Sequence, residues 1–321
     1  MSKSVIRLLL GMRTIFLLRI IKKLPKSRIK FLLSEFFDPN NLRKKIDFRL
    51  PERLITLHLQ SPPGGRAESY VVNINDHIGH RLFMDGKWDE TILNISEIIS
   101  IHEADILLDI GANIGAVSIP VALKTGCEVI AIEASPMNSS ILLKNISLNK
   151  VKFHTHNICA VNKYLMQNSD YIKIYNNRGN SGANSIHQNW NQNADGGQDF
   201  EFSKTALMDL LLSEDDLNRI KLIKIDVEGA ELALLQGFSK IFEINAPIIF
   251  EYRIDLMKRD LGNYGIELVK ELNKNYVLFG LRETENSRLV LKPFKQDTTA
   301  ENAIGIPKKS FEKYAKLFTF E

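Results

Sequence analysis

The chain has 321 residues, of which 44% are hydrophobic and 25% charged, and its formal net charge is +4. These proportions are typical of a globular protein and exclude wholesale disorder, collagen-like repeats and a disulfide scaffold. The length predicts two domains or one large α/β domain. Both cysteines, Cys127 and Cys159, lie in apolar runs. Such a position is typical of a buried thiol in a reducing compartment, and we expect a cytoplasmic protein.

The amino-terminal segment carries most of the excess positive charge. Residues 1–53 contain 14 Lys or Arg residues against four acids, and the mostly apolar stretch 5–21 includes three arginines. An arginine at the centre of a membrane span costs about 2.5–3.5 kcal/mol, so a span is the least favoured interpretation. We expect residues 1–50 to form a basic, apolar, helical arm packed on the main domain. Peripheral association of residues 1–30 with an anionic membrane is the alternative.

Nucleic acid is not a predicted partner. The basic segment lacks the interleaved aromatic platform that binds single strands. The rest of the chain holds 28 basic and 34 acidic residues, the remainder of the 42 and 38 in the whole sequence.

Strand and helix patterns follow in chain order after residue 51. Alternating apolar residues predict short strands at 54–59 and 70–74, with a Pro-Pro-Gly-Gly turn signal between them. The other expected strands are 105–109, 128–133, 153–161, 222–226, 248–251, 276–281 and 288–292, and the expected helices are 91–99, 116–123, 137–148, 206–212, 230–238 and 266–272.

The alternation of these elements predicts the fold class. Near-continuous apolar strands that alternate with helices indicate a parallel sheet buried on both faces. We predict an α/β fold with a Rossmann-like, doubly wound, mostly parallel sheet and an antiparallel edge hairpin. This domain spans 51–295, and 296–321 form a C-terminal extension. Segment 176–199 is rich in Asn, Gly and Gln, and we expect a long polar loop near the site.

Four of the predicted parallel strands end in an acid: Asp109, Glu133, Asp226 and Glu251. Parallel strands point their carboxyl ends to one edge of the sheet, where ligands bind, so the four acids are expected on one rim. Like charges raise one another's pKa, and such a rim needs cations or hydroxyl donors. S-adenosylmethionine would supply an ammonium group, a positively charged sulfur and a ribose diol.

The turn after the first of these strands supports a nucleoside ligand. Gly111 and Gly115 allow a tight bend and close approach of the backbone. Glu133, 24 residues beyond Asp109, ends the next strand, where an acid can accept hydrogen bonds from ribose hydroxyls. A nicotinamide dinucleotide site prefers G-x-G-x-x-G, and Asn113 interrupts that pattern, so an NAD-dependent oxidoreductase is kept as an alternative.

The motifs together resemble the FkbM family of S-adenosylmethionine-dependent methyltransferases. The matching strings are DIGANIG (109–115), EASP (133–136), IKIDVEGAE (223–231), LQG (235–237) and PIIFE (247–251), with Glu90 and TALMD (205–209) as further matches. The resemblance implies a class I Rossmann-like methyltransferase fold, S-adenosylmethionine as cofactor and O-methylation of sugar or natural-product hydroxyls. The donor-binding residues that it implies are Glu90, Asp109, Gly111, Asn113, Gly115, Glu133, Ala134 and Ala160. One departure from the family lies at Tyr252 and Arg253, where an apolar residue and His are common.

The acceptor end is assigned to Lys224, Asp226, Glu228 and Glu251. Lys224 and Asp226 share one face of a strand, and a buried lysine requires a carboxylate neighbour. Asp226 is the first choice for the general base or the contact to the acceptor hydroxyl. Lys224 is either a positioning cation or half of a structural ion pair. Glu228 lies near a helix N-terminus, where capping alone would explain its charge, and Glu231 either joins the site or lies on a solvated face.

Several interpretations of the site stay open. Asp226, Glu228 and Glu251 could bind a divalent cation through oxygen ligands, although the predicted site contains no metal. The predicted acceptor is a hydroxyl-bearing small molecule, sugar, glycan or glycolipid. A membrane-surface scaffold that keeps the fold without turnover is the non-enzymatic alternative. The sequence predicts no oligomeric state.

Overall fold

The computed structural model describes residues 54–59, 67–161, 163–177, 179–188, 190, 199–283, 289–295 and 300–321. The chain divides into two units, Met1–Glu52 and Arg53–Glu321. The arm predicted for 1–50 lies outside the described residues. Across the described ranges, no helix is both long enough and apolar enough to cross a bilayer.

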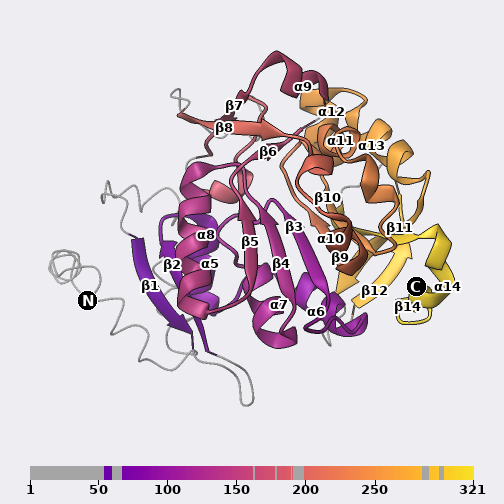
Figure 1. The fold of residues 1–321 in the computed structure, drawn as a ribbon, viewed down its shortest axis with the longest axis horizontal. Coiled ribbons are helices and arrows are strands. Elements are labelled where there is room, and N and C mark those ends of the chain that lie inside the picture. Colours follow the sequence, from indigo (N-terminus) through magenta and orange to yellow (C-terminus); the bar gives the residue numbers. More distant parts are fainter. Residues whose placement is uncertain are drawn as a thin grey trace, which may run out of the picture. The chain divides into compact units, whose positions relative to one another are not determined.

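A large mixed sheet forms the centre of the second unit (Figure 1). Its strands are β3 (Ile106–Ile110), β4 (Glu128–Ile132), β5 (Phe153–His156), β9 (Ile220–Ile225), β10 (Ile248–Tyr252), β11 (Tyr276–Glu283), β12 (Leu289–Pro293), β13 (Ala300–Pro307) and β14 (Thr319–Phe320). In the described part of the chain their order is β14-β12-β11-β13-β10-β9-β3-β4-β5. The five strands from β10 to β5 are mutually parallel, whereas β13 runs antiparallel to β10 and β11. The predicted doubly wound, mostly parallel sheet is confirmed.

Helices cover both faces of the sheet because the parallel strands are apolar on both sides. On one face Leu107 and Val129 pack with residues of α6 (Thr91–Ile98) and α7 (Ser118–Thr125). On the other face Leu108 and Ile130 pack with α10 (Glu214–Arg219), α11 (Glu231–Gln236), α12 (Ile254–Leu261) and α13 (Tyr264–Leu272). Adjacent residues of one strand therefore face opposite layers, which is the period-two alternation of a strand.

Smaller elements extend this core. The hairpin of β1 (Leu54–Leu59) and β2 (Glu68–Asn73) packs on α8 (Pro136–Asn149), where the buried Asn145 accepts a hydrogen bond from Val71 N and donates one to Ile114 O. Helix α5 (His77–Asp85) follows β2. A second sheet contains β6 (Cys159–Ala160), β7 (Tyr171–Tyr175) and β8 (Phe200–Ala206), with α9 (Lys163–Asn168) leading into β7. The chain ends with α14 (Phe311–Ala315) and β14.

The sheet differs from the sequence prediction at its antiparallel side. β11 and β12 form the expected hairpin, but β13 inserts between β10 and β11, so residues of the predicted C-terminal extension lie inside the main sheet. Gly305 interrupts the apolar pattern of β13, so the sequence periodicity did not predict this strand. A Cβ at Gly305 would lie 2.7 Å from Cγ2 of Ile248, so the close approach of β13 to β10 depends on a residue that interrupts the apolar pattern.

Two other expected elements also differ. The helix expected at 206–212 is only a 3-10 turn, η2 (Met208–Leu210). Its Asp209 carboxylate accepts hydrogen bonds from the backbone N–H groups of Ser239 and Lys240, so it binds a neighbouring turn, η3 (Ser239–Phe242). The strand expected at 153–161 is split into β5 and β6, and Asn157 between them donates to the carbonyl of Glu133 at 2.8 Å.

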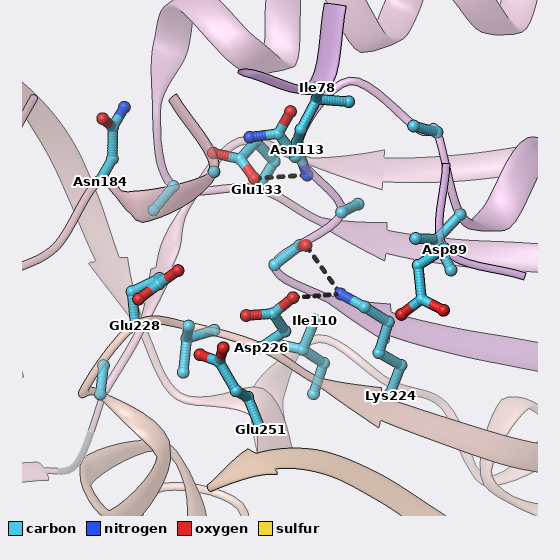
Figure 2. A pocket seen from close by; sticks show the side chains of 18 of the residues that line it. Ile78, Asp89, Ile110, Asn113, Glu133, Asn184, Lys224, Asp226, Glu228 and Glu251 are labelled. Carbon is cyan, nitrogen blue, oxygen red and sulfur yellow. Dashed lines mark hydrogen bonds and ion pairs between the residues drawn. The ribbon is translucent and has the colours of Figure 1, made fainter. Parts of the chain in front are cut away.

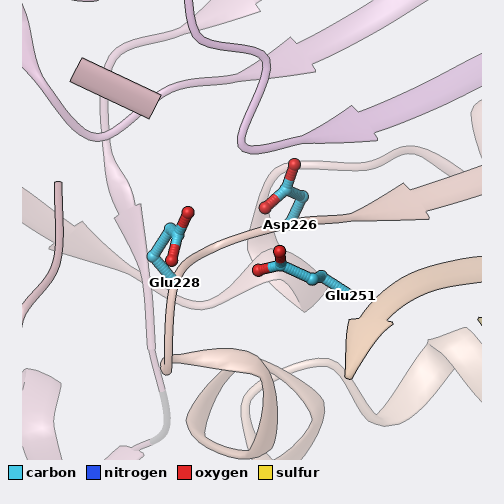
Figure 3. Close-up of side chains that lie close together, drawn as sticks. All are labelled: Asp226, Glu228 and Glu251. Carbon is cyan, nitrogen blue, oxygen red and sulfur yellow. The ribbon is translucent and has the colours of Figure 1, made fainter. Parts of the chain in front are cut away.

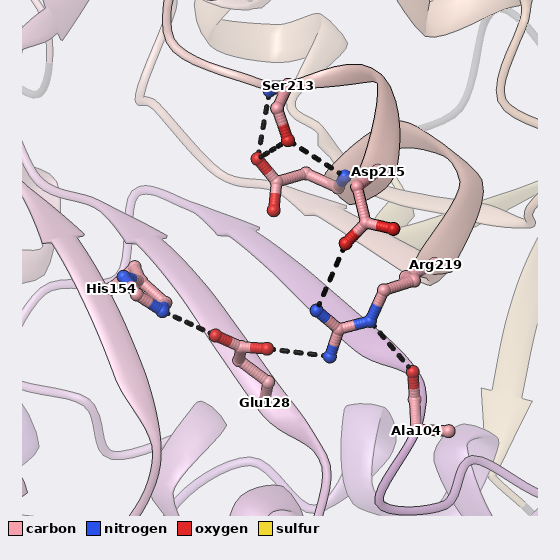
Figure 4. A network of polar contacts seen from close by, with 7 residues as sticks. Ala104, Glu128, His154, Ser213, Asp215 and Arg219 are labelled. Atoms are coloured by element: carbon pink, nitrogen blue, oxygen red, sulfur yellow. Dashed lines mark hydrogen bonds and ion pairs between the residues drawn. The ribbon is translucent and has the colours of Figure 1, made fainter.

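A polar network lies at the amino-terminal ends of β4 and β5 (Figure 4). Arg219 of α10 contacts Oε2 of Glu128 at 2.7 Å and donates from Nε to Ala104 O at 3.1 Å. His154 of β5 approaches the other oxygen of Glu128 at 2.5 Å. Because Glu128 begins β4, this network lies at the opposite end of the strands from their acid-bearing carboxyl ends.

Candidate active site

A cleft of about 870 Å³ opens at the carboxyl ends of the parallel strands (Figure 2). Nine of the twelve residues predicted for the site line it: Gly111, Asn113, Glu133, Ala134, Ala160, Lys224, Asp226, Glu228 and Glu251. Residues of segment 180–186 line it as well, so the polar loop expected near the site lies at the cleft.

The turn after β3 is shaped by three residues with positive φ. Gly111, Asn113 and Gly115 have φ values of +87°, +51° and +82°. A Cβ at Gly111 would lie 1.7 Å from the carbonyl oxygen of Asp226, so any side chain there would separate β3 from β9. Gly115 faces Leu142 and Ile119 rather than the cleft, and its role is to let α7 and α8 pack closely.

Glu133 ends β4 with its carboxylate pinned by backbone amides. Oε2 accepts from Asn113 N at 2.7 Å, and Oε1 accepts from Ser135 N at 2.8 Å. The side chain lines the cleft, yet the residue is only 7% exposed. Burial raises the pKa of Glu133 to about 7, against the lowering effect of these hydrogen bonds. Each oxygen keeps acceptor capacity for a hydroxyl donor in the cleft.

Lys224 lines the cleft and joins the cleft residue Asp226 to the buried Asp109. Its Nζ lies 3.3 Å from Oδ1 of Asp109 and 3.3 Å from Oδ2 of Asp226, and it donates to Gly111 O at 3.1 Å. Burial lowers the pKa of Lys224, but the two carboxylates outweigh this effect and hold the pKa above its ordinary value. Lys224 therefore stays charged in the buried half of β9, where its strand neighbours Ile223 and Ile225 are apolar.

Asp109 does not lie on the rim where the sequence analysis expected it. The residue is fully buried, does not line the cleft and has only the ammonium of Lys224 close to its carboxylate among the described residues. It precedes the last residue of β3, so it still lies within the sheet. Asp109 therefore has no direct contact with the cleft and instead holds the ammonium of Lys224, which lines it.

The three carboxylates Asp226, Glu228 and Glu251, which the sequence analysis assigned to the acceptor, converge in the cleft (Figure 3). Asp226, Glu228 and Glu251 each place one oxygen within 4.8 Å of the other two, a set that offers three ligands to a divalent cation. Burial and then the charge of Asp226 raise the pKa of Glu228, and the same two causes raise the pKa of Glu251. The cluster favours a bound proton, a cation or a hydroxyl donor. Lys224 already compensates one oxygen of Asp226.

Glu228 is held by the loop that precedes β8. Its φ is +49°, a conformation that ordinary residues rarely adopt. Trp190 Nε1 donates to Oε2 of Glu228 at 2.8 Å, and Ser185 Oγ donates to its carbonyl at 2.6 Å. The next residue, Gly229, has φ +94°, and a Cβ there would lie 3.0 Å from the Trp190 ring. The loop and the turn after β9 therefore fit each other closely.

Two of the remaining acids differ from expectation. Glu231 is 2% exposed, so it does not lie on a solvated face; its Oε1 accepts from Gly229 N, and burial raises its pKa to about 7. Glu90 lies outside the cleft lining, at the N-terminus of α6, and pairs with Lys87. Its neighbour Asp89 lines the cleft instead and accepts from Asn302 Nδ2 at 3.1 Å.

Sequence reasoning missed several residues of the cleft. Asp89 and Ser185 carried no motif, and Asn302 comes from β13, which was not predicted. Trp190, which holds the cleft residue Glu228 from behind the lining, carried no motif either. Arg253 lines the cleft, where it pairs with Asp255 at 3.1 Å. The sequence did single out this position, because Tyr252 and Arg253 are where the chain departs from the family pattern.

Comparison with known proteins identifies the family. Residues 109–275, more than half of the chain, match the model of the methyltransferase FkbM domain. No curated protein matches this chain. The chain therefore belongs to the FkbM family, and the S-adenosylmethionine-dependent methyltransferase predicted from its motifs is confirmed.

The solved structures that match this chain are remote from it in sequence. Precorrin-6y C5,15-methyltransferase from Geobacter metallireducens is 11% identical, with a TM-score of 0.37 and coverage of 68% of this chain and 88% of that one. TYW2 from M. jannaschii, in complex with AdoMet, is 14% identical, with a TM-score of 0.35 and coverage of 79% and 85%. An RNA methyltransferase from Salinibacter ruber, in complex with S-adenosyl-L-homocysteine, is 13% identical, with a TM-score of 0.28 and coverage of 51% and 76%.

Proposed function

We propose that this FkbM-family methyltransferase transfers a methyl group to a hydroxyl of a sugar, glycan or glycolipid. The observation that carries the proposal is the convergence of Asp226, Glu228 and Glu251 in the same cleft as Glu133. Carboxylates accept hydrogen bonds from the vicinal hydroxyls of sugars. The same acidic wall would repel the phosphates of nucleic acid, which favours a neutral, hydroxyl-rich acceptor.

The donor side has the groups that a nucleoside sulfonium ligand requires. Glu133 is the proposed partner of the ribose hydroxyls, because its oxygens are fixed by Asn113 N and Ser135 N and retain free acceptor capacity. Ala134 and Ala160 are small cleft residues beside it and are proposed to contact the base. When bound, S-adenosylmethionine supplies an electrophilic methyl group on a cationic sulfur. The excess of acids over bases around the cleft favours that positive charge.

Asp226 is the proposed base. Its side chain is 39% exposed, and its Oδ2 lies 3.3 Å from Nζ of Lys224. Lys224 holds this carboxylate in place and is therefore a positioning residue. Methyl transfer is an in-line displacement, so fixing the acceptor oxygen contributes much of the rate, and removal of its proton by Asp226 contributes the rest. Glu228 and Glu251 are proposed to hold neighbouring acceptor hydroxyls.

Incubation of the full-length protein with methyl-labelled donor and separate polysaccharide, glycolipid, small-molecule and RNA pools tests this function. We expect label in one of the hydroxyl-rich pools, and about 10²–10⁴-fold slower labelling by Asp226→Asn with donor affinity retained. Label found only in RNA would contradict the acceptor class. A thermal shift with NAD and none with S-adenosylhomocysteine would favour an oxidoreductase, and no labelled pool despite donor binding would favour a scaffold.

A further inference from the structure

The two-stranded ribbon of β7 and β8 exposes a row of aromatic side chains. Tyr171, Phe200 and Phe202 are 56%, 42% and 57% exposed. Each of these side chains is large enough to contribute about 1.5–3 kcal/mol when it is fully buried. Their exposure on one small ribbon is a feature that folding of this domain does not explain.

The register of the ribbon places these rings on one face together with two lysines. Tyr171 is opposite Lys204, Lys173 opposite Phe202, and Tyr175 opposite Phe200. Because side chains alternate along a strand, these six residues share one face. Phe200 forms edge contacts with Phe202 and Tyr175, and the Lys173 ammonium lies 4.4 Å from the centre of the Phe200 ring. We call this set the aromatic face.

The opposite face of the ribbon is directed into the protein. Ile174 and Ser203 are 3% and 2% exposed, and Ile174 lines the cleft. Glu201 Oε2 accepts from Ser135 Oγ at 2.5 Å, next to the donor side of the cleft. The inward face therefore holds the buried Ile174 and Ser203 and the half-buried Glu201, while the outward face leaves Phe200, Phe202 and Tyr171 exposed. Contiguous exposed apolar residues mark an interaction surface.

We propose that the aromatic face docks on the surface of an anionic lipid bilayer. It carries two lysines and no carboxylate; Glu201 faces inward, and Asp170 and Asp199 precede the two strands. Aromatic and apolar side chains combined with lysine characterise membrane–water interfaces. A sugar would need a flat platform, but the Phe200 and Phe202 rings meet at 86°. Residues 1–30 contain basic residues and no acid, which favours the same partner.

Docking through this face has a geometric consequence for the cleft. Ile174 lies in the cleft wall, while its neighbours Lys173 and Tyr175 belong to the aromatic face. One ribbon then separates the bilayer surface from the cleft, and an acceptor anchored in that bilayer would reach the site over a short distance. The proposal does not depend on the chemistry of methyl transfer.

A tryptophan placed on the aromatic face tests the docking directly. The full-length Phe202→Trp variant is mixed with phosphatidylcholine vesicles with and without phosphatidylglycerol, some carrying brominated acyl chains. We expect a blue-shifted emission and quenching by the brominated chains, stronger with the anionic lipid. Phe320→Trp is the matched control, because Phe320 is an aromatic residue that is 45% exposed. It lies on β14, an edge strand of the main sheet, whereas the ribbon belongs to a separate sheet. The signals of Trp88 and Trp190 are subtracted with the unmodified chain.

Each outcome decides the proposal. Quenching at position 202 but not at 320, together with about tenfold weaker vesicle binding of Phe200→Ser/Phe202→Ser, would support it. Vesicle binding without quenching at 202 would assign the contact to another segment and overturn it. Absence of vesicle binding would overturn it too. A blue shift that depends on protein concentration without lipid would replace the bilayer by a second copy of the chain.

Discussion

The two sides of the cleft solve the problem of buried charge in different ways. On the donor side, the Glu133 carboxylate accepts one backbone N–H at each oxygen, and the turn that supplies these donors is fixed by residues of positive φ. On the acceptor side, Asp226, Glu228 and Glu251 crowd together with few protein donors. The protein itself supplies hydrogen-bond donors to both oxygens of Glu133. The three clustered carboxylates need a bound proton, a cation or a hydroxyl donor to offset their charge.

This difference indicates where specificity can change. The proposed donor site consists of backbone amides and one acid, so we expect it to tolerate most side-chain substitutions. The acceptor side depends on side chains from the turn after β9, from β10 and from the loop that contains Trp190. Lys224 connects the two sides, because it holds Asp226 from below and contacts Gly111 in the donor turn.

Replacement of Lys224 by Met should have the largest effect, a loss of unfolding free energy. It removes the side chain that contacts both sides of the cleft. The fully buried Asp109 would lose the cation that compensates it, and such a loss typically costs about 3–5 kcal/mol of unfolding free energy. Chemical denaturation of Lys224→Met measures this cost.

The control for this prediction is Lys221→Met on the same strand, where no such pair is present. Adding Asp109→Asn to Lys224→Met should restore part of the lost stability, since it removes the uncompensated charge. Equal destabilisation by both lysine variants would show that the ion pair is not the cause.

Glu133→Ala should have the next largest effect and should break only the donor side. Loss of charge-assisted hydrogen bonds to ribose predicts about 10–100-fold weaker binding of S-adenosylhomocysteine by calorimetry. Because burial raises the pKa of Glu133 to about 7, the affinity of the unmodified protein should rise as the pH increases through 7. Glu251→Gln, on the other side of the cleft, should leave this affinity within about twofold. A donor affinity that falls equally in both variants would refute the separation of the two sides.

Five of the eight residues predicted for the donor side line the cleft, whereas Glu90, Asp109 and Gly115 do not. Gly111, Asn113 and Glu133 act through backbone conformation and short-range hydrogen bonds that the motif encodes. The parallel strands were predictable because burial on both faces leaves an apolar run. The roles assigned to these residues stay predictions until donor binding is measured.

The features that the sequence did not predict depend on contacts between residues that are separated in the chain. Asp109 was placed on the rim because it is near the end of a strand, but its side chain faces Lys224 from the neighbouring strand. β13 pairs with strands far away in the chain, and its Gly305 breaks the apolar pattern. Trp190 reaches Glu228 from a polar loop in which no periodicity marks a contact.

Glu231→Gln should have a smaller effect on stability. It tests whether the buried carboxyl group of Glu231 destabilises the fold when it is charged. The folded-state pKa of Glu231 is raised by burial to about 7, above the value of 4.5 for an exposed glutamate. Its contribution to stability is therefore complete below pH 4.5 and is lost as the pH rises through 7. Glutamine carries no charge at any pH, so the variant should be more stable than the unmodified protein at pH 8, by at most about 3 kcal/mol. Denaturation curves across this range check the sign, and a variant that is less stable at pH 8 would contradict it.

Trp190→Phe should produce the smallest effect and act on the acceptor side alone. Phenylalanine keeps a ring against Gly229 but removes the N–H that donates to Oε2 of Glu228. Glu228 would then be oriented less well, and we expect the KM for the acceptor to rise about 3–10-fold, the cost of one hydrogen bond. Donor affinity should not change, because Glu133 and its partners lie on the other side. The same substitution in a Glu228→Gln background should add little, since the carboxylate that Trp190 positions is already absent. An equal rise of KM in both backgrounds would mean that Trp190 contacts the acceptor directly, and a fall in donor affinity would show that the two sides of the cleft are coupled through the loop.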